Sequence, residues 1–140
     1  NGTIDAAVHG AWLAEVRLLC REYARVEVGD RCLGQLLSKA PEGKGGTWPC
    51  EAVCEAMEAI ASPEIGREFQ IGVYNSRGVH FRGEGGEQER EIAAKYRTWA
   101  ERLNYDYPYV GSILEGIAAS YEREAKREDS ETKISRRLRY

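Results

Sequence analysis

The side chains best suited to chemistry lie in residues 74–87, a polar stretch that contains four glycines. Loops of this composition often carry function, and arginine and histidine side chains bind carboxylates and phosphates. The candidates for binding an anion or a partner are Asn75, Arg77, His80 and Arg82. Four carboxylates at the start of the next helix would repel phosphate, namely Glu84, Glu87, Glu89 and Glu91. The simpler interpretation is a connector between helices whose arginines pair with neighbouring glutamates.

Few residues of the sequence are candidates for a catalytic role. Ser76, Arg77 and His80 lie close together, but no G-x-S-x-G turn surrounds the serine and no third catalytic residue stands out. Neither His9 nor His80 follows a glutamate at the Glu-x-x-His spacing of di-iron bundles, and the chain has no P-loop or dinucleotide-binding glycine pattern. We therefore expect a protein that is not an enzyme and needs no cofactor. A small hydrolase or nuclease centred on His80 is the third hypothesis.

The four cysteines show no zinc-binding pattern, because Cys50 and Cys54 form a C-x3-C pair on an expected helix and no C-x2-C pair exists. The N-terminal residues lack the basic-then-apolar order of a secretory signal, so we expect a reducing, cytoplasmic location with free thiols. The thiols are expected to act as small core residues and to bind no metal. The full set is Cys20, Cys32, Cys50 and Cys54.

Two surface features are candidates for an interface. Tyrosine is enriched in protein interfaces, although tyrosines in a short turn also fasten one helix end to its neighbour. The turn contains Tyr105, Tyr107 and Tyr109. The C-terminus is basic and could touch an acidic protein or a nucleic acid, or it could simply complement the dipole of a helix end. Its cations are Lys133, Arg136, Arg137 and Arg139.

Hydrophobic periodicity predicts three helices in the first third of the chain. The first covers residues 4–26, with an inward face formed by Val8, Trp12, Val16, Leu19, Cys20, Tyr23 and Val26. The second begins with Asp30 as its N-cap and ends before Pro41. The third opens at residues 47–49, buries Val53, Cys54 and Met57 among others, and stops at Ser62.

Residues 62–82 give conflicting signals. Ser62 followed by a proline is typical of a helix start, and Ile65, Phe69 and Val73 are spaced four apart. Two internal glycines oppose a helix, and alternating apolar residues allow a β-hairpin over residues 69–82 instead. We favour the helix and keep the hairpin as the alternative.

The second half is clearer. Ile92, Tyr96, Trp99 and Leu103 form the apolar side of a helix between Gly86 and Asn104. Pro108 then starts another helix, which continues through apolar residues up to Ala125, and the short connection makes the two helices antiparallel. We therefore predict one all-α bundle of five or six helices, with a helical domain over residues 1–128 and a charged helical extension over residues 129–140.

Composition narrows the function. A chain of 140 residues with a net charge of −3 has room for one core and is not a general nucleic-acid binder. No stretch approaches the roughly 18 apolar residues of a membrane-spanning helix, so we expect no membrane contact. The leading hypothesis is a non-catalytic adaptor or complex subunit, with a protein partner or a second copy. The alternative is a nucleic-acid-associated subunit using Arg77, Arg82 and the basic C-terminus.

Overall fold

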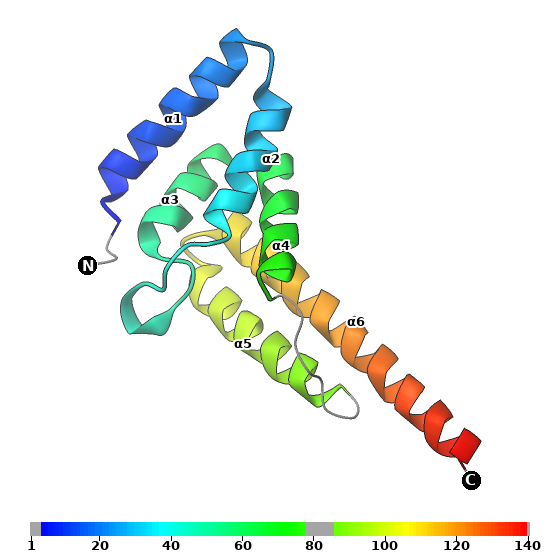
Figure 1. Cartoon of the computed structure of the whole chain (residues 1–140). Coiled ribbons are helices and arrows are strands. Elements are labelled where there is room, and N and C mark those ends of the chain that lie inside the picture. The colour runs from blue at the N-terminus through cyan, green and yellow to red at the C-terminus, as the bar shows by residue number, and fades with distance from the viewer. Residues whose placement is uncertain (1–3, 78–85, 140) are drawn as a thin grey trace.

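The computed structural model describes residues 4–77 and 86–139, and Figure 1 shows them as packed helices. No strand occurs in this part of the chain, so the predicted all-α bundle is confirmed. The helices are α1 (Ala6–Glu22), α2 (Val26–Leu37), a short 3-10 turn η1 (Lys44–Gly46), α3 (Glu51–Ile60), α4 (Pro63–Arg77), α5 (Glu87–Leu103) and α6 (Pro108–Arg139).

The conflict at residues 62–82 is resolved in favour of the helix as far as Arg77. The hairpin is wrong over these residues, and residues 78–82 lie outside the described part of the chain. Ser62 caps the helix, since its Oγ accepts a hydrogen bond from the Ile65 N–H at 3.4 Å. Ile65, Phe69 and Val73 are buried along one side of α4. Burial of this stripe outweighs the low helix propensity of the glycines.

The glycines of α2 and α4 mark a close approach of the two helices. A Cβ atom on Gly34 would lie 2.5 Å from the carbonyl oxygen of Ile65, and one on Gly72 would lie 2.2 Å from Ser38 Oγ. At Gly34 a Cβ atom would force the two backbones apart, and at Gly72 it would force the Ser38 side chain to move, so glycine lets the helices pack this closely. Gly72, which argues against a helix in the sequence, is therefore explained by packing.

The last two helices form the predicted antiparallel pair, and Figure 1 shows them side by side. The guanidinium of Arg97 on α5 donates two hydrogen bonds to the carboxylate of Glu122 on α6, at 2.6 and 2.8 Å. Asp129 on α6 accepts the Gly86 N–H at 2.8 Å and thereby caps α5. This hydrogen bond, together with the guanidinium of Arg90, lowers the pKa of Asp129.

This cap differs from the expected one. The sequence places several glutamates at the start of α5, but the carboxylate that accepts the N–H of Gly86, the residue before the helix, is that of Asp129, far along α6. Glu89, expected at the exposed helix start, is completely buried.

Aromatic side chains form the centre of the core. Trp48 packs on Phe69, Trp99 and Tyr96, with ring centroids 5.3, 5.7 and 6.0 Å away. The Trp48 indole N–H also donates to the Ala40 carbonyl oxygen at 2.6 Å. The loop before α3 is therefore fixed to both α4 and α5 through one side chain.

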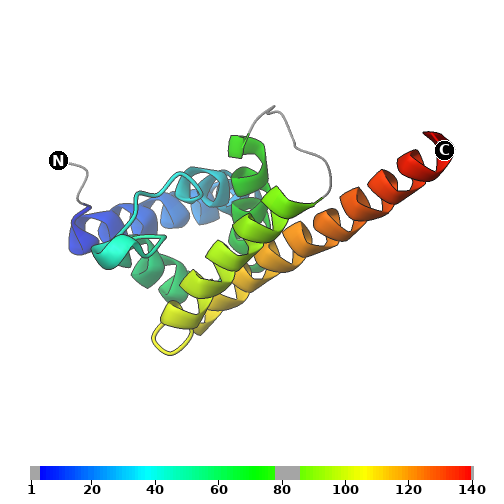
Figure 2. The same cartoon turned by 90° about the horizontal axis from the view of Figure 1, so that it is seen from below.

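α6 continues past the rest of the bundle. Its apolar residues from Val110 to Ala125 are buried, as predicted, whereas the last turns are exposed and Figure 2 shows them extending beyond α5. The helix crosses residues 128 and 129, where the sequence suggested a boundary, without a break. None of the helices in residues 4–77 and 86–139 is long and apolar enough to cross a membrane.

Candidate functional site

The structure places the loop candidates apart from any assembled site. Asn75 and Ser76 lie in the last turn of α4, and the Ser76 hydroxyl donates to the Val73 carbonyl oxygen at 2.8 Å. Arg77 is the last residue of α4, and His80 and Arg82 lie outside the described residues. The Ser76 hydroxyl therefore serves the backbone of its own helix.

The three tyrosines of the α5–α6 turn have different roles. Tyr109 donates its hydroxyl hydrogen to the Ser62 carbonyl oxygen, and its burial raises its pKa to about 12. Tyr107 is partly buried, and burial raises its pKa as well. Tyr105 is 95% exposed. Tyr109 thus fastens the start of α6 to α4, and Tyr105 projects into solvent.

The basic C-terminal candidates are all exposed. They lie on the last turns of α6, beyond the core, together with the exposed apolar residues Ile134 and Leu138. The full set of cations is Lys133, Arg136, Arg137 and Arg139.

α1 differs most from its predicted packing. The helix is shorter than expected, and the stripe predicted to face the core is largely exposed. Val8 is 69% exposed, Trp12 46%, Leu19 49% and Tyr23 73%. Leu13, which lies beside this stripe, is the only residue of α1 that is buried. The inward face of this helix was therefore predicted wrongly: the rest of the chain packs on a different side.

The exposed apolar surface continues onto α2. Val28 and Leu36 are each 52% exposed. The two helices touch where Cys20 meets Gly29, because a Cβ atom on that glycine would lie 2.5 Å from the cysteine Sγ. We call this surface the α1–α2 face, formed by Val8, Trp12, Leu19, Tyr23, Val28 and Leu36. Isolated exposed apolar residues are ordinary, whereas large contiguous apolar patches are a feature of interaction sites.

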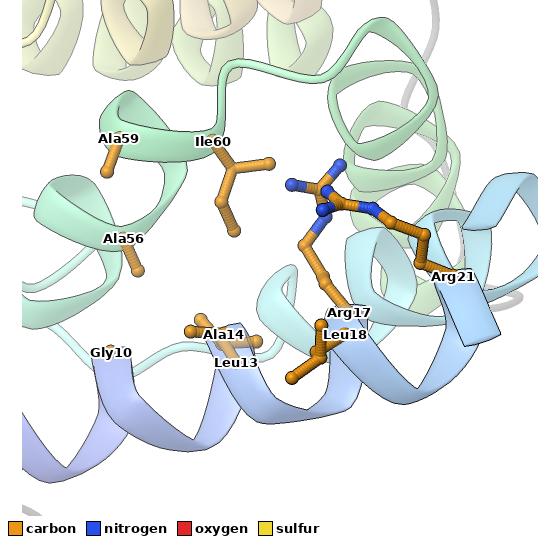
Figure 3. A pocket seen from close by; sticks show the side chains of 9 residues that line it. All are labelled: Gly10, Leu13, Ala14, Arg17, Leu18, Arg21, Ala56, Ala59 and Ile60. Atoms are coloured by element: carbon orange, nitrogen blue, oxygen red, sulfur yellow. The ribbon is translucent and has the colours of Figure 1, made fainter.

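A groove of about 370 Å³ lies on the other side of α1, where it meets α3. Figure 3 shows its apolar walls and the two arginines at one end. The Arg21 guanidinium makes no hydrogen bond or ion pair with any described residue. The groove can accept an apolar side chain with a carboxylate beside Arg21. Its lining residues are Gly10, Leu13, Ala14, Arg17, Leu18, Arg21, Ala56, Ala59 and Ile60.

A buried polar network holds α1 against the bundle. Arg17 donates two hydrogen bonds to the Asp30 carboxylate, at 2.9 and 3.0 Å, and Ser62 Oγ donates a third at 2.8 Å. The hydrogen bonds to Asp30 raise the pKa of Arg17. Asp30 was expected to cap α2, but α2 begins at Val26 and Asp30 lies within it, 3% exposed. The capping prediction was wrong because the carboxylate serves a contact between helices.

The cysteines only partly follow the expectation that they are core residues. Cys50 and Cys54 are buried, and burial raises the pKa of the Cys54 thiol to about 12. Cys32 is exposed on α2 and Cys20 is half-buried, so these two are not core residues. Within the described ranges, no three His, Cys, Asp or Glu side chains gather in a way that could hold a metal ion.

Comparisons with protein-family models, with curated proteins and with solved structures find no match for this chain. The candidate site is therefore assigned from geometry. Its four α1 residues, Val8, Trp12, Leu19 and Tyr23, are ones that the sequence pattern had placed inside. Periodicity alone gives no signal that separates a stripe facing the core from one facing a partner.

Proposed function

We propose that this protein is a helical assembly module that docks another protein chain on the α1–α2 face. The observation that carries the proposal is that α1, a helix of 17 residues with large apolar side chains, buries only Leu13. A helix with such a composition is normally covered on its apolar side. The missing cover is what a partner would supply.

The size of the surface supports this function. Six apolar side chains that are each about half exposed or more leave on the order of 500 Å² of apolar surface in contact with water. That is near the upper end for the largest patch on a monomer. Trp12 and Tyr23 are also of the residue types that contribute most to binding energy in interfaces.

Docking there needs no opening of the core. The side chains of Trp12 and Tyr23 already point away from it, whereas Leu13 and Arg17 attach α1 to the bundle from another side. The surface is therefore pre-formed, so a partner does not have to disrupt native contacts to bind.

A photo-cross-linking amino acid at position 12 or 23, introduced in the cells that make the protein, tests the proposal. We expect covalent adducts from both positions. The same amino acid at Tyr105, which is 95% exposed and lies in the turn between α5 and α6, is the matched control and should give none. Equal labelling at all three positions, or no adduct from positions 12 and 23, would contradict a docking role for this face.

A further inference from the structure

One side of α1 carries four exposed apolar residues whose spacing is the same in both directions, whereas Leu18, which is also exposed, lies outside this stripe and lines the groove beside α3. Val8, Trp12, Leu19 and Tyr23 are separated by four, seven and four residues. The midpoint of the outer pair and the midpoint of the inner pair both fall between residues 15 and 16. A surface with this property is complementary to itself in an antiparallel arrangement, which is the requirement for an interface with two-fold symmetry.

We infer that the occupant of the α1–α2 face is a second copy of this chain, bound with α1 antiparallel to α1 of its partner. This inference rests on the proposed docking function and names its partner. The two-fold axis passes between residues 15 and 16. Val8 then lies opposite Tyr23 of the partner copy, and Trp12 lies opposite Leu19 of the partner copy. Each pair combines a large side chain with a smaller one, so the stripes can interdigitate.

The available area meets the requirement of a weak to moderate dimer. Each copy presents on the order of 500 Å² of apolar surface, so the pair would bury about 1,000 Å² before polar atoms at the edge are counted. This is the lower limit for a specific interface. This area already includes Val28 and Leu36, so the contact has to extend from α1 onto α2, which touches α1 at Cys20 and Gly29.

The proposed dimer brings two like charges together near its centre. Glu15 is exposed and lies next to the two-fold axis, so the two copies of this carboxylate approach one another. Like charges on neighbouring helices weaken an association modestly. Removing this charge should therefore tighten the dimer, as expected wherever the two copies of Glu15 face each other.

Sedimentation equilibrium of the purified full chain tests the inference. We expect a dimer that dissociates on dilution. Trp12→Arg should raise the dissociation constant by at least about 30-fold, as should Leu19→Glu, because each places charges in the centre of the contact. Tyr105→Arg, at an exposed position outside the face, should leave it unchanged. Circular dichroism verifies that each variant keeps its helix content.

Mixing the two disruptive variants tests the antiparallel pairing. In the mixed dimer, arginine at position 12 of one copy faces glutamate at position 19 of the other, and the second pair keeps Trp12 against Leu19. We expect the mixture to dimerise although each variant alone is monomeric, and Glu15→Gln to tighten the wild-type dimer by about twofold. Failure of the mixture to dimerise refutes the antiparallel pairing.

A wild-type chain that stays monomeric at several hundred micromolar refutes the second copy as the occupant. If position 12 then cross-links to a different protein in cells, the proposed docking function stands and only the inferred partner is wrong. If position 12 gives no adduct in cells and the chain is also monomeric, both the inference and the proposed function are refuted.

Discussion

The network that joins Arg17, Asp30 and Ser62 allows a quantitative prediction of how α1 is attached. Asp30 accepts hydrogen bonds from both partners, and its side chain is 4% exposed, whereas that of Arg17 is 23% exposed. Removing one member of a buried ion pair leaves an uncompensated charge in a medium that solvates it poorly. The two single substitutions should therefore have unequal effects.

The magnitudes follow from this difference in exposure. Arg17→Ala leaves the buried carboxylate with only the Ser62 hydroxyl, and should lower the free energy of unfolding by about 3–5 kcal/mol. Asp30→Ala leaves a guanidinium that can reach water, so the loss should be smaller, about 2–3 kcal/mol. The double variant removes both charges and should cost about as much as Asp30→Ala alone. The coupling energy then equals the cost of Arg17→Ala, about 3–5 kcal/mol.

Urea unfolding at neutral pH measures all four free energies, provided that the dependence on urea concentration is the same for each variant. Arg31→Ala is the control, because Arg31 forms a 2.7 Å ion pair with Glu27 in which both side chains are about half exposed or more. That pair should contribute less than about 0.5 kcal/mol. Additive single effects, or a loss from Arg17→Ala no larger than that of the control, would refute the reasoning.

Three further predictions concern packing, thiols and acid. Gly34→Ala should destabilise the fold by roughly 1–3 kcal/mol, because the new Cβ atom would meet the backbone of α4. Gly10→Ala should stabilise α1 by about 0.5–1 kcal/mol, because nothing lies within 4 Å of the new Cβ atom. Urea unfolding measures both changes. A thiol reagent should modify exposed Cys32 rapidly and Cys54 only at the unfolding rate; fast modification of both would contradict the packing of α3. Because the pKa of Asp129 is lowered in the folded state, its contribution is present above its unfolded pKa of about 3.9 and is lost as the pH falls through the folded value. Asp129→Asn should therefore flatten the acid side of a thermal stability profile, and an unchanged profile would contradict the cap.

The sequence was sufficient for α6 and favoured the correct structure over the hairpin for α4, because each of these helices has one continuous apolar stripe. In α4 the spacing of Ile65, Phe69 and Val73 is that of a helix face, and all three are buried. In α6 the start at Pro108 and the buried residues up to Ala125 are as predicted. These helices are long or strongly periodic and have a polar opposite side, so one arrangement buries far more apolar surface than any other.

The contact that Asp30 makes between helices could not be predicted from the sequence. An aspartate near the expected start of a helix is a good N-cap, and sequence alone gives that local role the higher weight. The observed role depends on Arg17 and Ser62, which are 13 and 32 residues away in the chain. Local preference was overridden because pairing three buried polar groups avoids the cost of leaving any of them without a hydrogen bond.

The prediction of the buried side of α1 failed for a different reason, and that reason bears on function. This helix has apolar residues on more than one side, and its largest ones, Trp12 and Tyr23, lie on the side that the bundle does not cover. Periodicity measures where apolar residues lie around a helix and carries no information about which neighbour buries them. The bundle instead holds α1 through Leu13 and Arg17, while Gly10 and Ala14 line the groove beside α3. A helix that leaves its largest apolar side chains uncovered has the distribution expected when a second surface completes the burial.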